Sequence, residues 1–430
     1  MRTELNHLGL FEAAQAIQGG AITSTDLVRA CLDRIAEREP DVRAWAWLDP
    51  DTAMAAARQA DQQTTRGPLH GVPLAVKDII DTADMPTECG SAIYAGRRPS
   101  NDAACVALAR RSGALMLGKS VTTEFAYFSP GPTANPHNLA HTPGGSSSGS
   151  AAAVADAMVP AGFGTQTAAS LIRPASFCGV VAYKGSRSEF SLAGIKSFAP
   201  SFDSLGFITR HVQDAQWLRW ALLGMPASAS DLAPWTGRPR IGLCRTPWWP
   251  QADLSSQDAI EAAALLLSRH GAQVSEAVLP GHFEQLVDCH KTIMAYEAAR
   301  SLSYEHDQYP DRLSPQLLGL LSDGQQITRG HYLTALQSAT AARYAFHAWQ
   351  GQWDLLLTPS AVGTAPQGLH ATGDPLFSRM WTLLGVPSVS LPGYTGDLGL
   401  PVGIQLVAAF REDDKLLTMA RWVETRLLQP

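Results

Sequence analysis

The chain has 430 residues, 45% of them hydrophobic, and a formal net charge of −6. This length and composition predict a globular protein with a large buried core. A weakly acidic chain without a basic stripe does not suit a phosphate backbone, so we expect no nucleic-acid partner. No apolar run of about 18 residues occurs, and the start lacks the pattern of a signal peptide. These features favour a cytoplasmic protein without a membrane contact.

Residues 1–65 are predicted to form a helical N-terminal cover. The segment DLVRACLDRIAERE, residues 26–39, places its apolar side chains on one face, and Ser24 or Thr25 can cap its start. A second helix is predicted over DTAMAAARQADQQ, which follows Pro50.

Residues 66–225 show an alternation of strand and helix patterns. Two short apolar segments, GVPLAVKDIID and GALMLGKSV, flank a helical pattern around AACVALARRSG. This rhythm is typical of a layered α/β fold.

The second half of the chain is predicted to be mostly helical before it returns to strands. Residues 226–240, PASASDLAPWTGRPR, indicate a surface connection, and RIGLCR predicts a strand. Helical patterns dominate up to residue 350, in a variable segment that we expect on the substrate side. Residues 351–430 predict strands over DLLLTPS, VPSVSLPG and GLPVGIQLVA, and a last helix over DDKLLTMARWVETRLL.

Six scattered cysteines form no C-x-x-C pair. Neither a disulfide framework nor a zinc site is therefore expected, and we predict free thiols that pack as small apolar groups.

Two short motifs match known patterns but lie in the wrong context. Residues 113–120, GALMLGKS, fit the phosphate-binding G-x-x-x-x-G-K-[ST] pattern, yet apolar residues occupy the loop positions and no helix pattern follows. A buried strand ending at Gly118–Lys119 is the better interpretation. GSSSG at residues 145–149 fits the nucleophile elbow with Ser147 as nucleophile, but a polar, proline-broken segment precedes it instead of a strand.

Lys77 is the one ionisable amine inside the apolar run PLAVKDI. Burial disfavours the charged form of a lysine, so this amine is a candidate general base. Taken alone, the pattern favours a surface lysine at a strand end, or one paired with Asp78. Together with the serine-rich turns downstream, the pattern favours the general base instead.

The run TPGGSSSGSAAAVADAMVPAGFGTQTAASLIRPASFCGVVAYKGS, residues 142–186, resembles the signature region of the amidase signature family of serine hydrolases. The resemblance extends to GPLHGVPLAVKDIID, TTEFAYFSPGPTANPHN, SFDSLGFITR and the C-terminal strands, and the order Ser-Leu-Ile-Arg-Pro resembles malonamidase-type members. It implies one domain over residues 1–430, with a three-layer α/β/α fold in which helices cover both faces of a large mixed sheet.

The resemblance also implies a catalytic triad. Ser170 falls where the family has its nucleophile, Ser146 where it has a bridging serine on a cis peptide, and Lys77 where it has the base. Proton transfer from Ser170 through Ser146 to Lys77 would let Ser170 attack an amide carbonyl. The backbone N–H groups expected to hold the oxyanion are those of Thr167, Ala168, Ala169 and Ser170. Neither a metal nor another cofactor is expected.

Four further residues are expected to contact the substrate: Arg173, Gln166, Tyr127 and Gly145. Arg173 either clamps a substrate carboxylate or is a structural arginine, and the sequence leaves both open. Core packing is the simpler interpretation for Tyr127. Asp203 is interpreted as a structural residue that ties a turn.

The expected activity is hydrolysis of linear C–N bonds in small amides, with carbamates or urethanes, aryl amides and dicarboxylic monoamides all admissible. The family usually has glycine before the nucleophile, and this chain has Ala168 and Ala169, whose methyl groups would be strained at a positive φ. Two alternatives stay open: the amidase subunit of a tRNA-dependent amidotransferase, and a catalytically weak binding protein. Expected partners are a small-molecule amide and, at most, a second chain in a homodimer.

Overall fold

The structure is a computed structural model that describes residues 4–64, 67–225, 232 and 235–428. An 11-stranded mixed sheet runs through the molecule in the order β1-β3-β2-β4-β6-β5-β10-β11-β9-β7-β8. The strands are β1 (Trp45–Leu48), β2 (Pro73–Lys77), β3 (Leu115–Ser120), β4 (Ala161–Gln166), β5 (Val181–Lys184), β6 (Ser204–Thr209), β7 (Arg240–Leu243), β8 (Gln273–Glu276), β9 (Leu355–Pro359), β10 (Ser388–Thr395) and β11 (Pro401–Val407).

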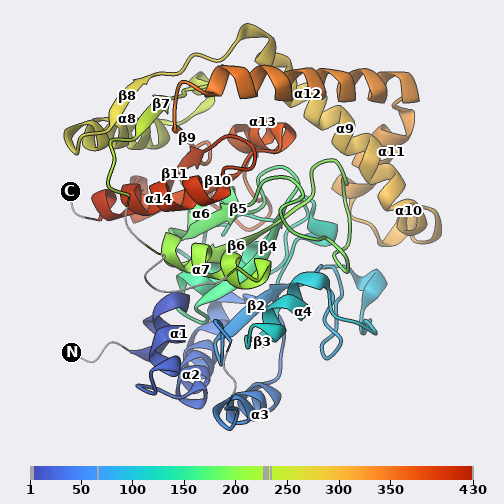
Figure 1. The fold of residues 1–430 in the computed structure, drawn as a ribbon. Helices are drawn as coiled ribbons and strands as arrows, with labels where there is room; N and C mark the ends of the chain where they lie inside the picture. The colour runs from blue at the N-terminus through green and yellow to red at the C-terminus, as the bar shows by residue number, and fades with distance from the viewer. Residues whose placement is uncertain (1–3, 65–66, 226–231, 233–234, 429–430) are drawn as a thin grey trace.

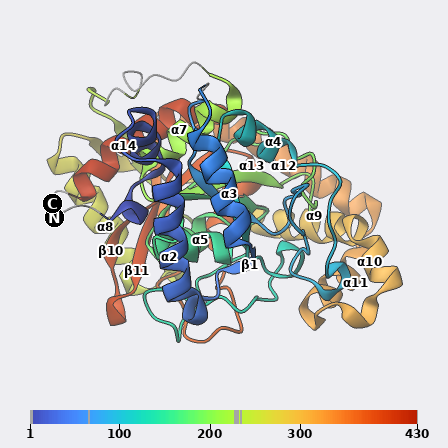
Figure 2. The ribbon, with the colours of Figure 1, turned by 90° about the horizontal axis from the view of Figure 1, so that it is seen from below.

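Helices cover both faces of this sheet (Figures 1 and 2). They are α1 (Leu10–Gln18), α2 (Ser24–Val42), α3 (Pro50–Asp61), α4 (Ala104–Arg111), α5 (Ser148–Ala155), α6 (Ile172–Cys178), α7 (Val212–Leu223), α8 (Leu254–Arg269), α9 (Leu286–Ser301), α10 (Ser303–Gln308), α11 (Pro315–Gln326), α12 (Arg329–Gln350), α13 (Leu376–Leu384) and α14 (Asp413–Leu427). Helices α4, α7 and α14 lie along one side, whereas α5 lies on the other, against β2 and β4. The predicted three-layer α/β/α architecture is confirmed.

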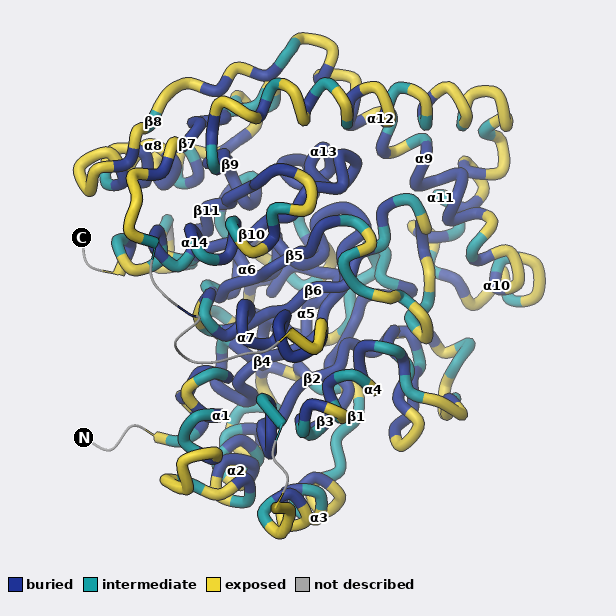
Figure 3. The backbone as a smooth tube through the Cα atoms, viewed as in Figure 1, coloured by how far each residue is buried: buried dark blue, intermediate teal, exposed yellow. Residues whose placement is uncertain are grey.

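The centre of the sheet is the most deeply buried part of the molecule, as Figure 3 shows. Every residue of β2, β4, β5 and β6 is buried. Helices on both faces of the sheet leave these strands without a solvated side, both where neighbours are parallel, as β2 and β4 are, and where they are antiparallel, as β4 and β6 are. Helices α9 to α12 instead lie together beyond the strands. Helices α10 to α12 expose much of their length, whereas α9 is mostly buried.

Most predicted elements of the first and last segments are present. The strand-helix-strand unit around residues 73–120 forms β2, α4 and β3, with β2 and β3 parallel. The three C-terminal strands and the last helix are β9, β10, β11 and α14. The proposed surface connection at 226–240 falls largely on residues outside those described.

Two details of the sequence prediction need correction. The cap of α2 is Thr23, not Ser24 or Thr25, because Thr23 and Asp26 exchange hydrogen bonds in a capping box. The inner strands β4, β5 and β6 were not predicted, and neither were β1 and β8. Strands β1 and β8 have four residues each and form the two edges of the sheet, where a strand is short and half-exposed and its apolar pattern is weak.

The described cysteines are all free, and all but Cys289 are buried. Their predicted role as small apolar side chains is confirmed. Among the described helices, none is both long and apolar enough to cross a bilayer.

Candidate functional site

Lys77 is the last residue of β2, and its side chain is completely buried. Its Nζ lies 2.7 Å from Oγ of Ser146 and 2.8 Å from Oγ1 of Thr165. Strand β2 pairs with β4 in parallel, so the end of each strand reaches the same edge of the sheet. This pairing brings Lys77 of β2 and Thr165 of β4 to the serine-rich turn that contains Ser146.

Burial is the main cause that holds the pKa of Lys77 well below the usual lysine value, and the charge of Asp203 opposes it only in part. A lowered pKa favours the neutral form of the amine, which is the form that can accept a proton. Pairing with Asp78, the other interpretation of this lysine, is not what the structure shows. Asp78 instead lies 3.3 Å from Nζ of Lys119 on the neighbouring strand.

Ser146 lies in the glycine-serine turn before α5, and the peptide bond that joins it to Gly145 is cis. The preceding Gly144 has φ of +80°, and a Cβ there would lie 2.9 Å from Cα of Pro174. Only glycine combines that backbone conformation with that close approach. The turn thus packs directly on α6 and directs the Ser146 hydroxyl toward Lys77.

The second turn, residues 167–170, connects β4 to α6, and here we call it the nucleophile turn. Each of its four carbonyl groups accepts a hydrogen bond from a different part of the chain. The pairs are Thr167 O with His290 Nε2 (2.8 Å), Ala168 O with Thr382 Oγ1 (2.8 Å), Ala169 O with Arg173 N (3.0 Å) and Ser170 O with Ser147 N (3.3 Å).

The four backbone N–H groups of the nucleophile turn are in the opposite situation. Within the described residues, none of them donates to a protein acceptor. Consecutive N–H groups left free beside a cavity form a concave site for an anionic oxygen. Neither Ala168 nor Ala169 has a positive φ, so their methyl groups cause no left-handed strain.

Ser170 lines the cavity beside these N–H groups and is 8% exposed. Its hydroxyl makes no hydrogen bond to any other described residue. The contact between Ser170 O and Ser147 N joins the two turns, so Ser146 and Ser170 belong to adjacent segments. Of the three residues predicted to act together, only Lys77 and Ser146 are directly hydrogen-bonded.

Gln166 is buried, and its amide oxygen and nitrogen both have protein partners. Its Oε1 accepts from the backbone N–H groups of Leu171 and Ile172, at 3.0 and 3.2 Å, while Nε2 donates to Thr382. An acceptor at the N-terminus of α6 satisfies N–H groups that the helix cannot. The side chain therefore fixes where the nucleophile turn meets the helix.

His290 of α9 was not singled out from the sequence, yet it contacts the nucleophile turn. Its Nε2 donates to Thr167, which leaves Nδ1 to accept from Arg379 at 3.1 Å. The ring stacks on Phe202 with centroids 4.4 Å apart. Burial and the charge of Arg379 hold its pKa well below the usual value, which keeps this tautomer neutral. Because residues 167 and 290 are far apart in the chain, no local motif predicts the contact.

Arg173 is 3% exposed and donates to Gly145 O (2.7 Å), Gly373 O (2.7 Å) and Thr372 Oγ1 (3.0 Å). Its Nε is buried without a hydrogen-bond partner among the described residues. Burial, together with the charge of Arg379, lowers its pKa to about 9. The arginine thus holds the carbonyl of the cis peptide and pairs with no carboxylate in this structure.

The cavity at Ser170 is small, with a volume of about 20 Å³, close to that of one water molecule. Tyr127 lines it and stacks on Phe198 with centroids 5.4 Å apart. Phe128 and Pro375 also line a larger neighbouring cavity of about 530 Å³, which includes Trp248 and several charged residues. The two cavities together offer a narrow reaction site with a wider, polar approach.

The phosphate-loop and nucleophile-elbow patterns, which did not fit their sequence context, both lie in buried parts of the fold. The phosphate-loop pattern belongs to β3, and Lys119 is buried with its Nζ 2.7 Å from Ile80 O. Ser147 is fully buried, and its hydroxyl contacts the backbone of Thr165 instead of a cavity. Asp203 accepts from the backbone of Phe198 and Ala199 and so ties its turn as predicted, and it also accepts from the Thr167 hydroxyl.

Comparisons with known proteins agree on one family. The model of the family described as Amidase matches residues 26–417. The A subunit of glutamyl-tRNA(Gln) amidotransferase from Acidothermus cellulolyticus is 33% identical, over 96% of this chain and 93% of the relative.

Solved structures are similar over nearly the whole chain. A crystal structure of an amidase has a TM-score of 0.89 at 30% identity and covers 97% of this chain and 100% of its own. The native peptide amidase from Stenotrophomonas maltophilia has a TM-score of 0.82 at 29% identity, over 98% of this chain and 97% of its own.

Proposed function

The chain belongs to the amidase signature family of amidohydrolases, and on that premise we propose that it hydrolyses the linear C–N bond of small amides with a triad of Ser170, Ser146 and Lys77. One observation carries the proposal. A buried lysine with a lowered pKa lies at hydrogen-bond distance from Ser146, and the adjoining turn presents a serine hydroxyl and four free N–H groups to one cavity.

The proposed reaction begins when Oγ of Ser170 attacks the amide carbonyl. Its proton passes to Ser146 while the Ser146 proton passes to Nζ of Lys77. The negative oxygen of the tetrahedral intermediate lies among the N–H groups of the nucleophile turn. Return of the proton through Ser146 to the nitrogen lets the C–N bond break and leaves an acyl ester on Ser170. Water, activated by the same relay, hydrolyses that ester and restores the serine.

The proposal assigns Arg173 a positioning role first. Three of its five N–H groups donate to the segments around the cis peptide and Gly373, so Nε–H and one Nη1–H remain for a substrate. Gly145 provides the carbonyl that Arg173 holds, and Gln166 fixes the start of α6. Tyr127 is the member of the predicted substrate-binding set whose ring lines the cavity without a hydrogen bond.

The cavity beside Ser170 favours amides whose acyl group is small. Its walls are mainly apolar or aromatic, from residues such as Phe128, Phe198 and Met294. Aryl amides and carbamates with short groups at the carbonyl meet this requirement better than dicarboxylic monoamides do.

Labelling with a fluorophosphonate tests the nucleophile. The wild-type protein should take up one equivalent and lose its amidase activity, and the Ser170→Ala variant should neither react nor turn over. Ser147→Ala is the matched control, because Ser147 is the nucleophile of the competing elbow pattern. Retained labelling in Ser170→Ala, or loss of labelling in Ser147→Ala alone, would contradict the assignment.

A substrate screen tests the role of Arg173. Ser170-dependent hydrolysis of an aryl amide, a carbamate and a dicarboxylic monoamide is compared between the wild type and Arg173→Ala. Positioning predicts a similar loss for all three classes, since the cis peptide loses its partner in every case. A loss confined to the anionic monoamide would assign the arginine to a substrate carboxylate instead.

A second candidate function rests on the relatives named as the A subunit of glutamyl-tRNA(Gln) amidotransferase. Such a role requires a partner protein, so affinity purification from the native host distinguishes the two. Amide hydrolysis by the isolated chain favours the amidase, whereas glutamine hydrolysis that depends on a copurifying partner favours the amidotransferase role. The third alternative, a weak binding protein, rested on strain at Ala168 and Ala169, and their φ values remove that reason.

A further inference from the structure

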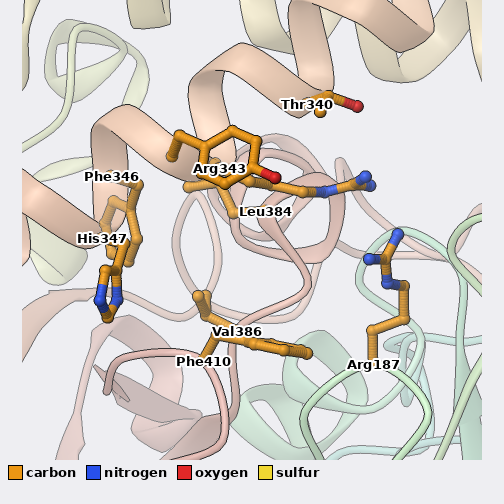
Figure 4. Close-up of a pocket in the computed structure, with 9 residues that line it drawn as sticks. Arg187, Thr340, Arg343, Phe346, His347, Leu384, Val386 and Phe410 are labelled. Carbon is orange, nitrogen blue, oxygen red and sulfur yellow. The ribbon is translucent and has the colours of Figure 1, made fainter.

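A second cavity, of about 390 Å³, lies between α12, the C-terminal end of α13 and the segments that follow β5 and β11 (Figure 4). It shares no residue with the cavity at Ser170. Its volume lies within the range of pockets that take small-molecule ligands, about 300–1,000 Å³. The lining residues are Arg187, Thr340, Arg343, Tyr344, Phe346, His347, Leu384, Val386 and Phe410.

Two arginines face one side of this cavity (Figure 4). The guanidinium of Arg187 forms no hydrogen bond or ion pair with any residue that the structure describes. Arg343 donates through Nε to Leu383 O at 3.0 Å, and its Nη2 is buried without a described hydrogen-bond partner. Burial and the charge of Arg187 lower the pKa of Arg343 to about 10. Two cations thus share a cavity whose lining contains no carboxylate.

The nearest acidic side chains are already used elsewhere. Glu189 is two residues from Arg187 but pairs with Arg219, at 2.7 Å, and with Arg411. Glu297, whose charge acts on Arg343, accepts from Ser201 and Tyr332. Among the described residues, no carboxylate is hydrogen-bonded to either arginine of the cavity, although the charge of Glu297 acts on Arg343.

The rest of the cavity combines apolar side chains with the polar groups of Thr340, Tyr344 and His347. Phe346, Leu384 and Val386 are at most 3% exposed, and Phe410 is 41% exposed at the rim. Figure 4 shows Phe346 and His347 on the side opposite the guanidinium of Arg187. A ligand that fills this space needs an anionic end and an apolar body.

We propose that this cavity binds a small organic carboxylate, with the carboxylate between Arg187 and Arg343 and an aryl or alkyl body against Leu384, Val386 and Phe410. A guanidinium presents parallel N–H donors that match the two oxygens of a carboxylate. An inorganic anion would meet the same charge but leave the apolar part of the cavity unfilled, where burial of an apolar group contributes affinity.

Isothermal titration calorimetry with 4-phenylbutyrate tests this site in the full chain. The neutral analogue 4-phenyl-1-butanol and inorganic phosphate should each bind at least about tenfold more weakly. Arg187→Gln and Arg343→Gln should each weaken 4-phenylbutyrate roughly ten- to a hundredfold, the range expected for a lost charge-assisted hydrogen bond. Arg173→Gln, at the other cavity, should leave its affinity unchanged.

Arg187→Gln is the decisive variant, because its side chain has no described internal bond to lose and its thermal midpoint should match the wild type. Arg343→Gln adds to the test only if it folds, since it removes the contact with Leu383. Equal binding of the alcohol, equal binding of phosphate, or unchanged affinity in a folded Arg187→Gln would each overturn the proposal. Loss of binding in Arg173→Gln would place the carboxylate at the other cavity and would overturn the proposal as well. No outcome of these titrations depends on whether Ser170 is the nucleophile.

Discussion

The residues around Lys77 and the outer helices α9 to α12 differ in how far their side chains are buried. In the first region, Lys77, Ser146 and Gln166 are at most 1% exposed, and each side chain has a protein partner. In the second, the helices bury one face and expose the other, to the extent that Tyr344 of α12 is 77% exposed. Polar groups in the first region have fixed positions, because burial keeps out the water that could replace their protein hydrogen-bond partners.

His290 is where the two regions meet. It belongs to α9 but is fully buried, and it donates to the nucleophile turn. Residues 77–170 contain the three proposed reacting groups, while the position of the nucleophile turn also depends on α9, which lies outside that range. Three substitutions and one pH dependence test whether the two regions differ in this way.

Replacement of Lys77 is expected to have the largest effect. Lys77→Met should lower kcat/KM by about 10³-fold, within the range for loss of a general base. Lys184→Met is the matched control, since Lys184 is equally buried and its amine donates, among the described residues, to Gly185 O alone. Steady-state kinetics on both variants, with circular dichroism to verify folding, measures the difference. An equal loss in Lys184→Met would mean that any buried lysine of the sheet matters through stability alone.

The second test is the pH dependence of activity and stability. Because burial lowers the pKa of Lys77 below 10.5, kcat/KM should rise with pH through that lowered value as the amine loses its proton. Between the two pKa values the unfolded lysine binds a proton that the folded one does not, so the free energy of unfolding should also rise with pH.

Urea titrations of Ser170→Ala and of the double variant Ser170→Ala with Lys77→Met isolate that contribution without turnover. The slope of the unfolding free energy against pH should be smaller in the double variant. Identical slopes would show that Lys77 has the same pKa in both states.

Loss of His290 should have an intermediate effect. His290→Ala removes the donor to Thr167 O and should lower kcat about 10- to 100-fold with little change in KM, as expected when reacting groups shift slightly. His290→Gln keeps an N–H donor and should recover part of the loss. The exposed His331 of α12 provides the control variant. A change in KM alone would assign His290 to substrate binding instead.

The smallest effect on turnover is expected inside the outer helices. Leu321 of α11 is fully buried, and Leu321→Ala should lower the free energy of unfolding by about 2–5 kcal/mol. Activity per folded molecule should stay unchanged, since α11 contacts the nucleophile turn only through α9. Chemical denaturation and active-site titration measure the two quantities separately. A fall in kcat similar to that of His290→Ala would show that the two regions do not differ in their effect on turnover.

The sequence was most informative where a pattern is local. The apolar run before Lys77 predicted β2, and the resemblance of residues 142–186 predicted the family and the layered fold. Strand β4, AGFGTQ, received no strand prediction because its glycines and polar residues weaken the apolar signal. The contacts of Gln166, Arg173 and His290 were also beyond reach, because each joins segments that only the folded sheet brings together.

The four tethered carbonyls of the nucleophile turn have a consequence for the order in which the enzyme is made. Synthesis proceeds from the N-terminus, so Lys77, Ser146 and Ser170 leave the ribosome well before His290 and Thr382. A nascent chain that stops short of α13 carries all three proposed reacting residues, yet the peptide groups that should face the substrate oxygen lack two of their four anchors. The turn is therefore expected to reach its full geometry, and the proposed hydrolysis its full rate, only after about nine-tenths of this sequence has been translated.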